Sequence, residues 1–387
     1  MSVLGVFQPN FRPVITPEEQ AWQDRERLAA LSMLRQRLNG GKVSLPLTWK
    51  IHRVLRAVEQ NQGQSAHVRA AAADLHASLP RPDLFELFDI LCTNEYEDAD
   101  GDLPSQRRRD RQTAAIAALH ERFPNGEEQV ETIEQLFSQI SASGISLKCG
   151  DSVMNQMCRS RAFLEAFSEY ALNYPRSIAA GNVAIAIDGW RHLDRVQFAR
   201  YGGLFARSES IRTAASVASG VSQGAWQELL TREDLEILTI LANRSEPGVL
   251  YATIYGLKRL TKAPAFRQAA LDLIAGMKIN GHQDLAQEYI EIFGHHGLSG
   301  AMLTRAHVEK IFTNLVEVEQ LKDHPFDGLL TSVCGVAPKA IVSFLQARIV
   351  RAIALEQQGV DSDYEPIPNH LSWSVLRAAR DDALSPA

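Results

Sequence analysis

The segment Leu229–Val316 constrains the fold of this chain most strongly, because it reads as five successive helices separated by short breaks. Leu235, Leu271 and Val308 occupy equivalent positions of alternate helices, 36 and 37 residues apart. A helix pair that recurs at this period is typical of a repeat array, in which each pair buries its apolar side by stacking on its neighbours. The five helices are expected at Arg232–Asn243, Val249–Lys262, Ala265–Met277, Gln283–Phe293 and Leu303–Val316.

Helical patterns also fill most of the chain before this segment. Thr16 suits the N-cap of a helix and Pro17 suits its first turn, so we predict a helix from there to Leu38. Amphipathic spacing predicts further helices at 48–60, 65–79, 82–93, 107–123 and 127–141. The glycine-containing residues 142–150 form the clearest break, which indicates a domain boundary.

Beyond this break the helical pattern is continuous. We expect one long helix from Asp151 to Tyr174, then helices at 182–193, 195–206 and 208–219, and a long closing helix at 338–357. Residues 183–189 alternate like a strand, but the residues after them have helical spacing and no partner strand is evident elsewhere. A helix is therefore favoured there, and the whole chain is predicted to be all-α.

The predicted architecture is an α-solenoid, a right-handed superhelix of antiparallel helix pairs with an N-terminal helical subdomain. We assign residues 1–143 to that subdomain and residues 151–357 to HEAT-like helical repeats. Residues 358–387 are expected to form an extended tail with a short helix at about 371–380.

Composition narrows the class of protein. Of 387 residues, 45% are hydrophobic and 22% are charged, which is ordinary for a soluble folded protein. The net charge of −6 argues against a dedicated nucleic-acid binder, whose domain is usually basic. No apolar run reaches the roughly 18 residues of a membrane span, and no secretory signal is recognisable. The four cysteines form no C-x-x-C pair, so we expect buried free thiols in a reducing cytoplasm.

Two motifs suggest metal binding but are incomplete. Asp98–Asp102 resembles the start of a calcium loop, yet Leu103 stands where glycine is required and Arg109 where the final glutamate is required. The pair His295-His296 lacks the spacing that places two imidazoles on one helix face. Neither G-x-x-x-x-G-K-[ST] nor G-x-G-x-x-G occurs in the chain. We therefore expect no metal site and no cofactor.

Gly220-Val221-Ser222-Gln223-Gly224 matches G-x-S-x-G, the nucleophile elbow of serine hydrolases. That chemistry needs a strand before the serine and a helix after it. The residues before Ser222 are rich in alanine and serine and read as a helix, so a turn between helices is the favoured interpretation. A serine hydrolase using Ser222 remains an alternative, although no complete catalytic motif is found and we expect no enzyme activity.

One predicted repeat helix combines aromatic and cationic side chains. Tyr251, Tyr255, Lys258, Arg259 and Lys262 lie close together on it or at its end. If this helix lines the concave face, the combination suits an acidic peptide or a phosphate-bearing partner. These five residues are the predicted partner-binding site.

The helix-pair pattern over about 182–357 resembles HEAT and armadillo repeats. Ser160–Tyr201 and Pro338–Pro368 are also similar in style to the helical sensor regions of bacterial STAND-type NTPases of phage defence. That resemblance implies recognition of a foreign protein by the repeats, while the ATPase motifs of the family are missing here.

The expected function is a non-catalytic protein-binding or scaffold module that recognises a protein partner on an extended helical-repeat surface. A DNA-binding HEAT-like protein of the alkyl-base glycosylase type is the alternative. It requires Arg and Lys clustered on the concave helices, and the overall acidity of the chain disfavours it.

Overall fold

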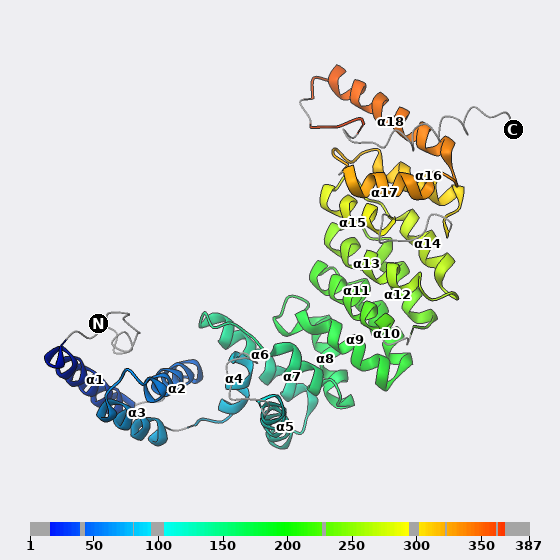
Figure 1. The fold of residues 1–387 in the computed structure, drawn as a ribbon. Helices are drawn as coiled ribbons and strands as arrows, with labels where there is room; N and C mark the ends of the chain where they lie inside the picture. The colour runs from blue at the N-terminus through cyan, green and yellow to red at the C-terminus, as the bar shows by residue number, and fades with distance from the viewer. Residues whose placement is uncertain are drawn as a thin grey trace. The chain divides into compact units, whose positions relative to one another are not determined.

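The computed structural model of the chain describes residues 16–38, 43–79, 81–93, 104–226, 230–293, 302–321, 323–360 and 363–367. Every regular element within these residues is a helix, which confirms the all-α prediction (Figure 1). The segment 183–189, whose pattern alternates like a strand, is helical. Among the described helices, none combines the length and the apolar character that crossing a membrane requires.

The chain divides into two compact units, Met1–Met157 and Cys158–Ala387. The domain bounds drawn from the sequence stay a prediction, because compact units need not coincide with domains. In unit 1 the helices are α1 (Pro17–Leu38), α2 (Leu45–Gln60), α3 (Ala66–Ser78), α4 (Phe85–Cys92), α5 (Pro104–Arg122), α6 (Gly126–Ala142) and α7 (Gly150–Met157).

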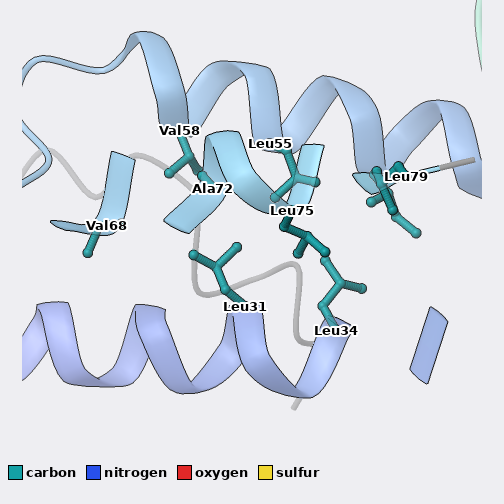
Figure 2. Packing of buried hydrophobic residues seen from close by; sticks show 9 residues of the cluster. Leu31, Leu34, Leu55, Val58, Val68, Ala72, Leu75 and Leu79 are labelled. Carbon is teal, nitrogen blue, oxygen red and sulfur yellow. The ribbon is translucent and has the colours of Figure 1, made fainter. Parts of the chain in front are cut away.

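The first three helices of unit 1 share one apolar core. Leucine side chains of α1 pack against leucine, isoleucine and valine side chains of α2 and α3, with Ala72 of α3 among them (Figure 2). Thr16 and Ser65 cap α1 and α3 by accepting hydrogen bonds from the backbone N–H groups three residues later, at 3.1 and 3.3 Å. The buried members of this core are Leu31, Leu34, Ile51, Leu55, Val58, Val68, Ala72, Leu75 and Leu79.

The single helix predicted from Asp151 to Tyr174 is wrong, because the chain forms two helices there. α7 ends at Met157 and α8 (Arg161–Asn173) begins after Ser160, which has extended backbone angles. The Cys158 carbonyl between them lies so close to Gly189 that a Cβ on that glycine would be 2.9 Å from the oxygen. Packing therefore ends the helix where the side-chain pattern continues.

Unit 2 contains all but the first seven residues of the predicted repeat region 151–357, and α17 is the one of its described α-helices that the sequence patterns did not predict. The helices are α8, α9 (Val183–Leu193), α10 (Arg195–Ala206), α11 (Ile211–Trp226), α12 (Arg232–Ala242), α13 (Pro247–Leu260), α14 (Arg267–Gly276), α15 (Gln283–Phe293), α16 (Arg305–Leu315), α17 (Asp323–Val333) and α18 (Pro338–Gln357), with a short 3₁₀ helix at Ala179–Asn182 before α9.

Helices two apart in sequence pack against each other throughout unit 2. The odd-numbered row consists of α9, α11, α13, α15 and α17, and the even-numbered row consists of α8, α10, α12, α14, α16 and α18. Helices consecutive in sequence connect the two rows from α8 to α14. Figure 1 shows the helices of this unit following one another in chain order.

Helix α11 makes the most extensive contacts in unit 2, with α9 on one side and α13 on the other. Small residues permit this approach. A Cβ added to Gly220 would lie 2.6 Å from the Ala184 carbonyl oxygen of α9. On the opposite side, a Cβ added to Gly256 of α13 would lie 2.9 Å from the Ser222 hydroxyl. Larger residues at these positions would separate the helices.

Gly220→Ala is expected to destabilise the protein, although alanine normally stabilises a helix interior. Backbone atoms block the new methyl group, so we expect a loss of about 1–3 kcal/mol. The control is Gly276→Ala in α14, where nothing lies within 4 Å of the added Cβ and a gain of up to about 1 kcal/mol is expected. Denaturant midpoints followed by circular dichroism measure both changes. Equal stabilisation of the two variants would contradict the close contact.

Candidate partner-binding surface

Tyr251 and Tyr255 lie one turn apart on the side of α13 that faces away from the core. Their exposed fractions are 41% and 37%, whereas neighbouring residues such as Val249, Leu250 and Ile254 are fully buried. The two rings have centroids 5.4 Å apart and are tilted by 59°. The pair therefore presents aromatic surface to solvent in a defined arrangement.

Glu288 of α15 binds both tyrosines. The Tyr251 hydroxyl donates a hydrogen bond to Oε1 at 3.2 Å, and the Tyr255 hydroxyl donates to Oε2 at 2.5 Å. The hydrogen bond to Glu288, followed by burial, raises the pKa of Tyr255 well above its ordinary value. One carboxylate thus orients two aromatic rings from the neighbouring helix of the odd-numbered row.

Two more carboxylates share the face of α15 that carries Glu288. Asp284 and Glu291 are one turn before and one turn after it, and both are exposed. Glu291 accepts a hydrogen bond from Gln287 at 2.8 Å. We call Asp284, Glu288 and Glu291 the acidic edge of the surface that α13 and α15 form on their outward side.

Of the three cationic residues of the predicted site, two lie on the outward side of α13 or just beyond its end, and the third contacts another helix. Spacing places Lys258 on the stripe of α13 that carries the tyrosines, and the exposed Lys262 follows the end of the helix. Arg259 instead contacts α11, where its Nη1 donates to the Ser222 carbonyl at 2.8 Å. Burial lowers its pKa. Arg259 therefore connects two helices of the fold, in contrast to the outward-facing tyrosines.

Ser222 lies inside helix α11, so the strand-to-helix turn of a nucleophile elbow is not formed there. Its side chain is buried, and its hydroxyl donates to the Ala218 carbonyl at 2.8 Å. The expected turn between helices at 220–224 is also wrong, because α11 continues to Trp226. The serine fits here as a small residue opposite Gly256, where α11 and α13 touch.

Within the described residues, the cysteines form no disulfide and the candidate metal ligands form no metal site. All four cysteines are free thiols; Cys92, Cys149 and Cys158 are buried and Cys334 is half-buried. In the described part of the chain, no group of three or more His, Cys, Asp or Glu side chains could hold a metal ion. The acidic loop at 98–103, His295-His296 and the expected helix at 371–380 lie outside the described residues.

Sequence reasoning missed Glu288, although the repeat period contains a signal for it. Glu288 follows Tyr251 by 37 residues and Tyr255 by 33. These separations bracket the period of the repeat, so Glu288 occupies the position of the tyrosines in the next helix of the odd-numbered row. Comparing equivalent positions of successive repeats would have identified it.

Comparison with known proteins does not assign the chain to a family. No protein-family model matches this sequence, and no curated protein matches it either.

Glu288→Gln is expected to lower the pKa of Tyr255, because the hydrogen bond to the carboxylate holds that pKa above its ordinary value of about 10. A raised folded-state pKa stabilises the folded protein below about pH 10 and this contribution is lost as pH rises further. A spectrophotometric tyrosine titration of the folded variant should show earlier tyrosinate formation. Glu291→Gln, which removes the same charge from the same helix face, should leave the titration nearly unchanged.

Proposed function

We propose that this chain is a non-catalytic protein-binding or scaffold module and that the outward side of α13 and α15 is part of its binding surface. The observation that carries the proposal is the exposed pair Tyr251 and Tyr255, whose hydroxyls are both bound by Glu288. Exposed tyrosines with fixed rings contribute large contact area at low entropic cost, which is a property of protein-binding surfaces.

The pattern of helix contacts supports an α-solenoid of HEAT-like antiparallel pairs as the architecture behind this surface. Each helix from α8 to α16 packs on the helix two positions later, and the hydrogen bonds from α13 to α15 span 33 and 37 residues. Stacked repeats of this kind expose one stripe of each helix in a row, so side chains from successive repeats form a continuous surface.

A protein partner fits this surface better than DNA does. The DNA-binding alternative requires clustered Arg and Lys, but the outward side of α13 and α15 carries three carboxylates as well as Lys258 and Lys262. Arg259, the third cation, contacts the backbone of α11. Carboxylates close to phosphate groups oppose the electrostatic attraction on which DNA binding depends.

The proposal predicts that substitution of the outward side of α13 removes partner binding while the fold is kept. Affinity capture from the native host would compare the wild-type chain with the variant Tyr251→Ala, Tyr255→Ala, Lys258→Ala. The matched control carries Tyr174→Ala and Lys310→Ala, two exposed residues outside the odd-numbered row. A partner retained by wild type and control should be lost from the α13 variant by at least about tenfold, as quantitative mass spectrometry would report.

Equal retention by all three proteins would exclude this surface as the binding site. Circular dichroism of each protein establishes that the fold is intact. If no protein is retained specifically by the wild-type chain, the protein-binding function itself is contradicted.

A further inference from the structure

In unit 2, a tyrosine, a glutamate and an arginine form a cluster in which each side chain contacts the other two. The Tyr201 hydroxyl donates to Glu169 Oε1 at 2.8 Å. Arg200 lies over the Tyr201 ring, with its guanidinium carbon 4.8 Å from the centroid, and pairs with the same carboxylate oxygen at 3.3 Å. One guanidinium thus contacts both the ring and the carboxylate that the ring's hydroxyl binds.

The outward side of α13 and α15 repeats the tyrosine–glutamate part of this arrangement. Two tyrosine hydroxyls bind Glu288, and both rings are exposed. Within the described residues, no guanidinium or ammonium group lies over either ring or forms an ion pair with Glu288. A carboxylate offers about four lone-pair sites, so Glu288 can accept further hydrogen bonds beside those from the tyrosines.

We propose that Tyr251, Tyr255 and Glu288 form a surface site for the guanidinium group of an arginine side chain presented by a basic segment of the protein partner. The inference rests on the proposed protein-binding function and specifies its partner. The guanidinium would stack on a tyrosine ring and donate to Glu288, as Arg200 does with Tyr201 and Glu169. Arginine suits this site better than lysine, because its planar fork stacks on rings and donates two hydrogen bonds at once.

The charges around the tyrosines favour a cationic occupant. Asp284 and Glu291 flank Glu288 on the exposed face of α15. Lys258 and Lys262 lie three and seven residues beyond Tyr255, which corresponds to about 5 and about 10 Å along the helix direction. Glu288 therefore contacts the tyrosines directly, whereas the lysines lie one and two turns beyond Tyr255. An acidic partner would meet the lysines but would oppose Glu288.

The test is fluorescence anisotropy with labelled peptides in which arginine, lysine or glutamate alternates with glycine, at about physiological ionic strength. The wild-type chain should bind the arginine peptide more tightly than the lysine peptide and the glutamate peptide most weakly. Replacing Tyr251 and Tyr255 by alanine should weaken arginine-peptide binding by about tenfold, since each ring contributes a cation–π contact. Glu288→Gln, which keeps an acceptor for the tyrosines, should weaken it about threefold or more.

Two substitutions serve as matched controls. Tyr174→Ala removes another exposed tyrosine of unit 2, and Glu309→Gln removes an exposed carboxylate of α16 that pairs with Arg305. Both should leave arginine-peptide affinity unchanged within about twofold, and circular dichroism establishes that every variant is folded. If the control variants lose as much arginine-peptide affinity as the tyrosine and Glu288 variants do, the binding is diffuse attraction to an acidic protein and the proposal is overturned.

Two further results would also overturn it. One is arginine-peptide binding that does not respond to the tyrosine and Glu288 substitutions, and the other is no detectable binding of that peptide by the wild-type chain. If the affinity capture described above still depends on α13 in those cases, the protein-binding function stands and only the arginine site is excluded. Failure of both experiments would exclude both.

Discussion

The close contact between α11 and α9 at Gly220 is the constraint on which the arrangement of unit 2 depends. With no side chain at Gly220, the backbones of these helices meet, and Gly256 and Ser222 allow a similar approach of α13 on the other side. Dispersion contacts between helices strengthen as the backbones approach, and small residues permit that approach without a void. Helix α11 thereby fixes the position of α13, on which the tyrosine pair lies.

Buried arginines then connect helices that side-chain packing alone would leave free to slide. Arg191 of α9 donates to Asp234 of α12 at 2.6 Å, with both side chains fully buried, and also to the Gly220 and Val221 carbonyls of α11. Arg348 of α18 is likewise buried and donates to carbonyls after α16, including that of Val318 at 2.6 Å. Removing one partner of such a contact leaves an uncompensated buried group, so these arginines define which helix positions face each other.

Most helix positions in this chain are determined by local sequence features, namely apolar periodicity and capping residues, and could therefore be predicted from the sequence. The periodic apolar residues, the cap at Thr16 and the proline at the start of α18 located their helices within a few residues. The break at Cys158 and the continuation of α11 through Ser222 were missed, because both depend on contacts with α9 and α13. The tyrosines of the candidate site were predicted, but Glu288 was not, since its role arises only when α15 lies beside α13.

Packing of α13 against α11 and α15 leaves the helix with an exposed stripe that carries Tyr251 and Tyr255. Arg259 is turned toward α11, whereas Tyr251 and Tyr255 are turned toward α15, so residues neighbouring on the helix surface have separate roles. Because Glu288 already holds both tyrosine hydroxyls, a partner of the proposed kind would cause little further loss of side-chain entropy at these rings. The rings cost little further ordering, and the free lone pairs of Glu288 remain accessible beside them. The aromatic pair thus lies outside the buried core, and its hydroxyls connect α13 to α15 through Glu288.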